Sequence, residues 1–347
     1  MFTPSALPRN LEASFRDLGS ERPATRASAV RDVVRHALRS DATRSRAIPL
    51  LERALKDDEA SGVRAEAAVA LADVAAGEAL PTLLVAVEDD DAHVRQMALA
   101  AIGEIGDARA TQRLERALRD ARPEVRYQAV IAFARVAKDD APAVAAALVR
   151  ALDDEDSAIR YIAMRVAEEQ AAALRDDRLA ARATELVEGP DAAVAVVAAL
   201  YLARLGRAPG PQVVLDVVAE RREAPELEDE QACVEAAGEL EMRDAIPSLE
   251  RRVWGRRRAL RTIFSFGAGD QASCAWHARI ALARMGHERA REDVLRDLGS
   301  WRRETREAAV VAAGRAGMSE ARAALENLGG SVDAALVREA LVRLGVG

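Results

Sequence analysis

A short helical pattern recurs along this chain at a nearly fixed spacing, and this period limits more than any other feature what the chain can fold into. Its signature is a Val-Arg or Ile-Arg pair followed by an apolar stripe of Ala, Leu and Val. The arginines of four copies lie 31, 31 and 34 residues apart, at Arg64, Arg95, Arg126 and Arg160. A period in this range indicates a stack of small helical units and not one globular core.

Each unit is predicted to contain two helices, A and B, joined by a tight turn. In Asp91–Gly106 apolar residues recur at spacings of three and four, as on the buried face of a helix B. The aspartate at its start and the glycine at its end are predicted to cap this helix, and Asp120 and Asp156 to cap the next B helices. Arg95 and its equivalents lie one turn into helix B. There they can bridge to an acidic residue of their own or a neighbouring repeat and form a ladder.

These features resemble the HEAT family, in particular the short HEAT-like repeats of phycobilin lyases. The residues that carry the resemblance are the D-x-x-V-R-x-x-A core of Asp91–Ala98 and its copies, over nearly the whole chain. The resemblance implies an all-α fold, an α-solenoid in the form of a right-handed superhelix of about ten HEAT-like helix-turn-helix repeats. Because the family hosts many functions, it implies the fold and not the activity.

We expect one solenoid domain over residues 1–347. Its predicted regions are capping repeats at 10–57, regular repeats at 58–220, degenerate repeats at 221–286 and C-terminal repeats at 287–347. Two segments break the period: an acidic, Pro-containing stretch at 221–230, predicted to be a loop, and an Arg-rich expansion at 251–271.

Composition excludes several classes of protein. The net charge of −7 argues against general nucleic-acid binding, although residues 241–347 hold 19 basic and 14 acidic residues, against 31 and 43 in residues 1–240. Cys233 and Cys274 are the only cysteines and lack metal-ligand spacing, which is typical of reduced thiols in a cytosolic protein. No apolar run reaches the roughly 18 residues that span a bilayer. We expect a bacterial cytoplasmic protein without membrane insertion.

No motif predicts an enzyme, a cofactor or a metal site. The sequence has no phosphate-binding glycine loop and only four histidines. Deoxyhypusine hydroxylases, a HEAT-repeat family, bind two irons through four His-Glu pairs, whereas this chain has only His287-Glu288. HEAT-like alkylpurine DNA glycosylases use Trp and Asp on a basic face. Trp254, Trp276 and Asp270 near one Arg cluster leave that activity open as an alternative. The resemblance to phycobilin lyases leaves a lyase-like activity open as well, although nothing else in the chain indicates a tetrapyrrole site.

Two rows of helix B residues are candidates for a protein-binding face, because the HEAT resemblance places helix B on the concave side. The position after the ladder arginine carries Tyr127, Tyr161 and Trp276, which could anchor a partner or fill gaps between helices. We predict a contact surface of Tyr127, Tyr161, Arg165 and Trp276. Eight residues further on, the row changes from mainly acidic to mainly basic: Asp73, Glu104, Arg135, Glu169, Arg204, Glu239, Arg284, Arg315 and Arg343. This row is either a graded groove that orients a partner or a plainly solvated position.

The Arg-rich expansion is a second candidate contact, comprising Trp254, Arg256, Arg257, Arg258 and Arg261. Its arginines could dock an acidic protein segment, cover apolar surface with their stems, or contact nucleic acid or acidic lipid.

The predicted function is a non-enzymatic scaffold or regulatory adaptor that binds protein partners, with no evident small-molecule substrate. The stretch Ala275–Ala290 resembles HEAT-repeat proteins of gliding bacteria, one of which assists a GTPase-activating protein of a small Ras-like GTPase in cell polarity. That resemblance implies an accessory regulator of such a GTPase complex. The alternative is a nucleic-acid-binding or glycosylase-like protein.

Overall fold

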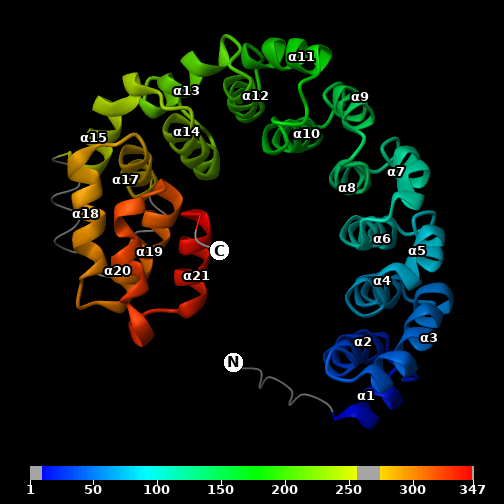
Figure 1. The fold of residues 1–347 in the computed structure, drawn as a ribbon. Coiled ribbons are helices and arrows are strands. Elements are labelled where there is room, and N and C mark those ends of the chain that lie inside the picture. Colours follow the sequence, from blue (N-terminus) through cyan, green and yellow to red (C-terminus); the bar gives the residue numbers. More distant parts are fainter. Residues whose placement is uncertain (1–9, 256–273, 346–347) are drawn as a thin grey trace, which may run out of the picture. The chain divides into compact units, whose positions relative to one another are not determined.

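The computed structural model describes residues 10–255 and 274–345 (Figure 1). These residues form α-helices and short 3-10 turns, with no β-strand among them. The chain divides into two compact units, Met1–Leu179 and Ala180–Gly347. The predicted all-α solenoid is confirmed, and the helices in the described part of the chain pair as A and B ten times. None of these helices combines the length and the apolar character needed to cross a membrane.

Unit 1 alternates short A helices with longer B helices. Its helices are α1 (Leu11–Asp17), α2 (Pro23–Ala37), α3 (Asp41–Asp57), α4 (Ser61–Ala75), α5 (Leu80–Ala86), α6 (Ala92–Ile105), α7 (Thr111–Ala117), α8 (Pro123–Val136), α9 (Ala141–Ala151) and α10 (Ser157–Glu169). The next helix, α11 (Asp177–Val187), begins at the end of this unit.

Unit 2 continues the same alternation. Its helices are α12 (Ala192–Arg204), α13 (Gly210–Val218), α14 (Leu227–Glu239), α15 (Ile246–Trp254), α17 (Cys274–Arg284), α18 (Glu288–Leu298), α19 (Arg303–Ala316), α20 (Arg322–Glu326) and α21 (Ala334–Arg343). Short 3-10 turns lead into α5, α7, α15 and α20.

Each unit consists of two layers of helices. In unit 1 the B helices α2, α4, α6, α8 and α10 pack in succession, and α3, α5, α7 and α9 form the other layer (Figure 1). In unit 2 the B layer is α12, α14, α17, α19 and α21, and α13, α15, α18 and α20 form the A layer. The core lies between the layers and is built from small and aliphatic side chains such as Leu71, Leu99 and Leu114, all fully buried.

Helix α6 shows how a repeat starts and ends a B helix. The Asp91 carboxylate accepts hydrogen bonds from the backbone N–H groups of His93 and Val94, at 2.9 and 3.2 Å. Gly106 ends the helix with φ of 70°, a left-handed conformation that glycine adopts without steric cost. Both predicted caps of α6 are confirmed, and Asp156 caps α10 in the same way.

Asp120 does not cap α8, so this prediction was wrong. The N-cap residue is Arg122, and Pro123 follows as the first helical residue. Because proline has no N–H, one of the unpaired donors at this helix end is absent. Asp120 lies two residues before the N-cap and accepts the backbone N–H of Arg122 at 2.9 Å.

Three B helices approach the next B helix so closely that only glycine fits at the contact. A Cβ atom on Gly103, Gly238 or Gly314 would lie 3.0, 2.6 or 2.8 Å from the Cα of an alanine on that helix. All three glycines stand eight residues after the ladder position of their repeat. Close contact of this kind needs small residues on both helices, which explains a core rich in alanine and poor in aromatics.

The predicted loop at 221–230 is shorter than expected. Helix α14 begins at Leu227, so the second half of the segment is its first turn. Glu228, Asp229 and Glu230 lie in that turn, where negative charge is stabilised by the helix dipole. Of the Arg-rich expansion at 251–271, the structure describes only the part up to Gly255.

Candidate protein-binding face

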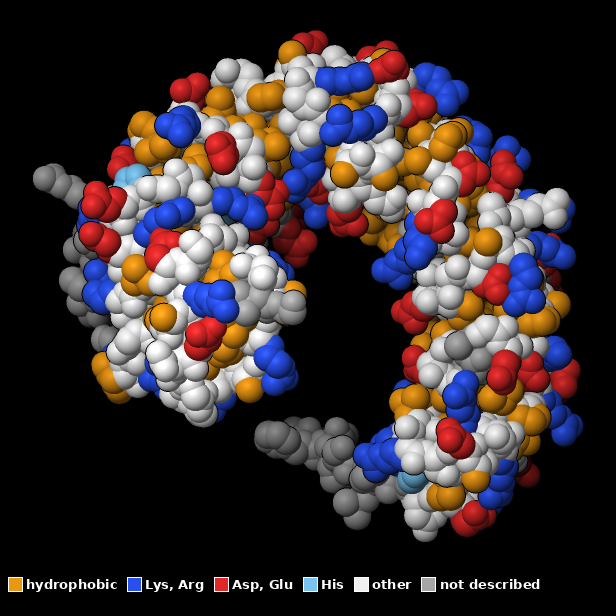
Figure 2. Space-filling model, viewed as in Figure 1, with side chains coloured by type: hydrophobic (Ala, Val, Ile, Leu, Met, Phe, Trp, Pro, Cys, Tyr) orange, Lys and Arg blue, Asp and Glu red, His pale blue; other side chains and the backbone are white. Residues whose placement is uncertain are grey.

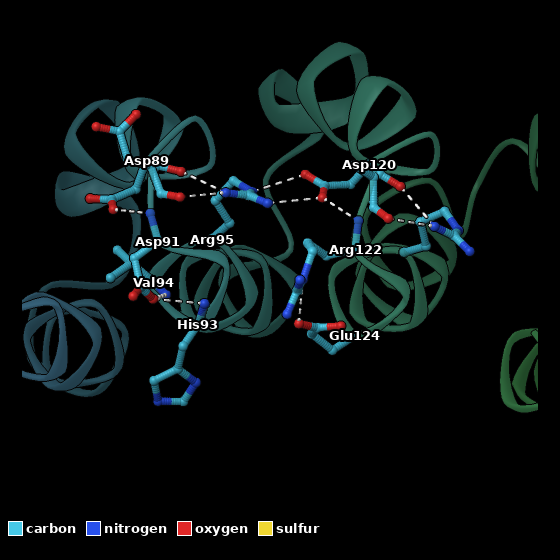
Figure 3. Close-up of polar contacts among 11 residues, drawn as sticks. Asp89, Asp91, His93, Val94, Arg95, Asp120, Arg122 and Glu124 are labelled. Atoms are coloured by element: carbon cyan, nitrogen blue, oxygen red, sulfur yellow. Dashed lines mark hydrogen bonds and ion pairs between the residues drawn. The ribbon is translucent and has the colours of Figure 1, made fainter.

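Arg95 joins two consecutive repeats through a bidentate ion pair (Figure 3). Its Nε and Nη2 each donate to one carboxylate oxygen of Asp120, both at 2.9 Å. Its Nη1 donates to the carbonyl oxygens of Asp89 and Asp90, in the link of its own repeat, at 2.8 and 3.2 Å. The Arg95 and Asp120 side chains are only 15% and 16% exposed. The planar guanidinium thus donates hydrogen bonds to acceptors in two repeats at once.

The same rung occurs three more times in unit 1, always with an aspartate of the following repeat. The pairs are Arg26–Asp58, Arg64–Asp89 and Arg126–Asp154, with N–O distances between 2.7 and 2.9 Å. Each of these aspartates also accepts a backbone N–H two residues further along. The predicted ladder is confirmed in unit 1, where it joins neighbouring repeats and shapes the links between helices A and B.

The ladder lowers the pKa of its aspartates. Burial alone would raise the pKa of these carboxyl groups, which belong to Asp58, Asp89, Asp120 and Asp154. The hydrogen bonds from the arginine and from the backbone, together with the nearby positive charge, outweigh burial and hold the pKa below its usual value. A lowered pKa in the folded state means that ionised aspartate stabilises the fold.

Acid is therefore expected to unfold unit 1 before unit 2. The ladder's contribution is complete above the unfolded-state pKa of about 4 and is lost as the pH falls through the lower folded-state values. All three tryptophans belong to unit 2, so their fluorescence reports on that unit, whereas circular dichroism reports on both. On acid titration, helicity should fall at a higher pH than the tryptophan signal changes. In addition, Asp120→Asn should be less stable than the wild type at pH 7 and converge with it in acid. The prediction would be contradicted if helicity and tryptophan fluorescence changed at the same pH and if Asp120→Asn remained less stable than the wild type in acid.

Unit 2 contains a rung of reversed charge that the repeat pattern did not predict. Glu230 occupies the ladder-arginine position, and Arg252 at the end of α15 donates to its carboxylate at 2.5 Å. Arg252 also donates to the carbonyl oxygens of Val217 and Val218, at the C-terminus of α13, at 3.2 and 3.0 Å. Its side chain is 9% exposed, so this arginine of the Arg-rich expansion stabilises the fold.

The predicted contact residues of unit 1 lie on two neighbouring B helices. Tyr127 and Tyr161 are half-buried at the same position of α8 and α10, which pack against each other. Arg165, one turn after Tyr161, lies 3.5 Å from Glu168 and 3.9 Å from Glu169 of its own helix. Arg135 is exposed near the end of α8. The structure therefore brings two aromatic rings and two arginines onto one pair of adjacent helices.

In unit 2 three arginines of the second row pair with glutamates of α14. Arg204 donates to Glu239 at 2.6 Å, and Arg284 lies 3.4 Å from the other oxygen of the same carboxylate. Arg315 pairs with Glu235 at 2.9 Å. These pairs compensate much of the charge that the sequence suggested as a gradient, a role that neither interpretation of the row included.

Trp276 is a core residue of unit 2. It is 6% exposed and packs edge-to-face on His277, with ring centroids 5.0 Å apart. Its Nε1–H has no acceptor in the described part of the chain. The neighbouring His277 Nδ1 lies 2.7 Å from Glu235, so this histidine is packed and hydrogen-bonded. For Trp276 the structure favours gap filling over an anchor for a partner.

Trp254 is held against α18. Its Nε1 donates to Asp293 at 3.1 Å, its ring lies 5.4 Å from that of His287, and the Arg289 guanidinium lies 4.3 Å from its centroid. The other predicted residues of the expansion, Arg256, Arg257, Arg258 and Arg261, lie outside the described residues, as does Asp270.

Sequence reasoning missed two surface features. Trp301, in the link before α19, is 83% exposed. An apolar groove of about 480 Å³ crosses the first turns of α2, α4 and α6. The signal for the first was its place in a Gly-Ser turn, outside any helical stripe, and the signal for the second was Gly62 and Ala65 where later repeats have larger residues.

The described residues contain no group of three or more side chains suited to a metal ion. Both cysteines are free, with Cys233 buried and Cys274 half-buried. Burial, together with the hydrogen bond to Glu230, raises the pKa of the Cys274 thiol to about 12. This thiol is therefore protonated at neutral pH and is a weak nucleophile.

Comparison with known proteins identifies the repeat. The family model of HEAT repeats matches residues 48–134. The predicted HEAT resemblance is thereby confirmed over a region that contains two complete ladder rungs, Arg64–Asp89 and Arg95–Asp120. No curated protein matches the chain in sequence.

Solved structures resemble this chain at low identity. The Escherichia coli protein YibA is 16% identical, and the alignment covers 81% of this chain and 93% of that one with a TM-score of 0.52. The complex of CpcE and CpcF of phycocyanin lyase from Nostoc sp. PCC7120 gives 19% identity, coverage of 72% and 96%, and a TM-score of 0.43. An engineered protein gives 20% identity, coverage of 96% and 97%, and a TM-score of 0.43. The similarity to YibA concerns the fold alone.

Proposed function

We propose that this HEAT-repeat chain is a non-enzymatic scaffold or regulatory adaptor that binds a protein partner across α8 and α10. The observation that carries the proposal is the pair of half-buried tyrosines, Tyr127 and Tyr161, at the same position of two adjacent B helices. Rigid amphipathic rings of this kind are favoured anchors in protein interfaces. Arg135 and Arg165 on the same two helices favour a partner with acidic groups beside its apolar contact.

The distribution of charge over the surface suits a protein partner better than a nucleic acid. On the face shown in Figure 2, acidic and basic side chains are interspersed and hydrophobic side chains lie between them. Nucleic-acid affinity depends mainly on phosphate contacts by an excess of basic groups. In addition, Trp254 and Trp276, the rings that suggested a glycosylase, are packed within unit 2. The mixed surface therefore supports protein binding.

The narrower proposal is an accessory role for a small Ras-like GTPase and its GTPase-activating protein in bacterial cell polarity. It rests on the resemblance of Ala275–Ala290, which forms α17, the following turn and the start of α18. Identification of the bound partner tests this proposal together with the general one.

Affinity purification of the tagged chain from its own cells should yield a stoichiometric protein that Tyr127→Ala/Tyr161→Ala loses. Each substitution should weaken binding of that partner about tenfold or more, as for anchor aromatics. Leu50→Ala is the matched control, because Leu50 is 38% exposed on the A helix α3. Circular dichroism would confirm that all variants fold. Retention of the partner by the double variant would exclude this face, and enrichment of nucleic acid alone would favour the alternative function.

A further inference from the structure

Trp301 is the largest exposed hydrophobic side chain in the described residues. It is 83% exposed in the link between α18 and α19, and the Arg302 guanidinium lies 4.8 Å from its ring centroid. At this exposure the ring contributes almost nothing to the core. Tryptophan and arginine together are the residues most enriched where proteins bind one another.

The link holds this ring outward by the same hydrogen bond that shapes the ladder links. Arg306 Nη1 donates to the Ser300 carbonyl oxygen at 2.7 Å, as Arg95 Nη1 donates to that of Asp89 at 2.8 Å. Trp301 therefore occupies the link position five residues before the ladder arginine. The other repeats with this arginine carry mostly acidic residues there: Glu21, Glu59, Asp90, Ala121 and Glu155. In this repeat an exposed tryptophan occupies that position, and the hydrogen bond of the turn is the same.

The groove of unit 1 has the size and lining to receive such a ring. Its volume of about 480 Å³ is within the roughly 300–1,000 Å³ of pockets that bind organic groups. Its lining is mostly apolar and includes Ala27, Gly62, Ala65, Val69 and Met97. It is open because α4 carries small residues where the equivalent positions of α8 carry Glu124 and Tyr127.

The charges around the two features are opposite. The groove lies over the first turns of α2, α4 and α6, next to links with exposed acidic side chains at Glu21 and Glu59. Glu66 lines the groove, where it pairs with Arg31, and Arg22 is the basic residue of these links. The ring of Trp301 is followed by two exposed arginines, Arg302 and Arg303, of which Arg303 pairs with Glu307 of α19 at 2.7 Å. A cationic aromatic group thus matches an apolar groove with an acidic edge.

We propose that this protein associates with itself, with Trp301 of one copy inserted into the α2–α4–α6 groove of a second copy. Arg302 then faces the acidic link at Glu59. Because the two surfaces differ, the contact is head-to-tail and leaves one ring and one groove free at the ends of each dimer. A contact of one ring and one link is small, so the association is weak and salt-sensitive. It uses none of the residues of the proposed partner site on α8 and α10.

Sedimentation velocity of the purified full chain tests this proposal with two blocking variants. Trp301→Ala removes the ring, and Gly62→Arg fills the groove at a position where an added Cβ meets nothing within 4 Å. Gly330→Arg is the matched charge control, since its Cβ also meets nothing within 4 Å. Leu38→Ala, at 65% exposure, is the control for loss of an exposed apolar side chain. Each variant is first shown to be folded by circular dichroism.

The wild type should associate over loading concentrations of roughly 1 to 300 µM, and less so as salt is raised. Either blocking variant alone should weaken association at least about 30-fold, while the two controls behave as the wild type. An equimolar mixture of Trp301→Ala and Gly62→Arg should form a dimer that grows no further, because only one ring and one groove remain functional. A wild type that stays monomeric would overturn the proposal. Association that survives either variant, or a mixture that fails to pair, would overturn it as well.

Discussion

Replacement of Arg95 by Ala is expected to lower the free energy of unfolding by about 2–4 kcal/mol. The substitution leaves the Asp120 carboxylate, 16% exposed, without its bidentate partner. It also removes the donor to the carbonyl oxygens of Asp89 and Asp90. Because one guanidinium serves two repeats, the loss should reach the packing of α6 against α8. Urea unfolding followed by circular dichroism measures the change.

Arg113→Ala is the matched control for this prediction. Arg113 pairs with Glu88 across the same two repeats, but the side chains are 38% and 62% exposed. Exposed pairs of this kind contribute less than about 1 kcal/mol. The combination of Arg95→Ala with Asp120→Ala should be less destabilising than the two changes added together, because the second no longer leaves a carboxylate unpaired. Equal effects of Arg95→Ala and Arg113→Ala would show that the ladder is an ordinary surface ion pair.

Gly238→Ala is expected to destabilise unit 2 by about 1–3 kcal/mol, although alanine is the better helix former. Its Cβ would lie 2.6 Å from the Cα of Ala281, so α14 and α17 must move apart. Gly62→Ala in α4 should instead stabilise the protein by about 0.5–1 kcal/mol, because its Cβ meets nothing within 4 Å. Urea unfolding, monitored by tryptophan fluorescence for unit 2 and by circular dichroism for both units, measures the two changes.

The test is whether Gly238→Ala and Gly62→Ala change the free energy of unfolding in opposite directions. If both variants were stabilised, the α14–α17 contact would be loose enough to accept a methyl group. If both were destabilised, the groove over α4 would be closed in solution. The first outcome would contradict the close α14–α17 contact, and the second would contradict the open groove over α4.

Much of the fold could be predicted because the same pattern of helix caps and apolar residues recurs in several repeats. Helix α6 has its cap, its apolar stripe and its terminal glycine in consecutive residues, and these determine its ends with little help from the rest of the chain. The prediction for Asp120 failed because Asp120 stands six residues before Arg126, whereas the N-cap of both α6 and α8 lies four residues before the ladder arginine. Asp120 instead pairs with Arg95, the ladder arginine of the preceding repeat. A choice between two partners depends on where the neighbouring repeat lies.

The candidate site was less predictable than the fold. Tyr127, Tyr161 and Trp276 share one position in the repeat, yet the first two are half-buried and Trp276 is 6% exposed. Arg252 stood in an arginine-rich run that suggested a docking patch, but it closes a rung of reversed charge with Glu230. Trp301, which carries no periodic signal, is the exposed tryptophan. The exposure of a side chain depends on the size of the residues on adjacent helices. The periodicity of the sequence does not show which residues those are.

The sequence by itself determined the all-α solenoid, the start and end of helices such as α6, and the ladder arginines, because these depend on contacts within one repeat or with the next. Only the tertiary structure decided which aspartate each arginine binds, which tryptophan is buried, and where small residues leave a groove. These features depend on the distance between neighbouring helices. That distance is set by pairs such as Gly103 and Ala132, which lie about one repeat apart in the sequence.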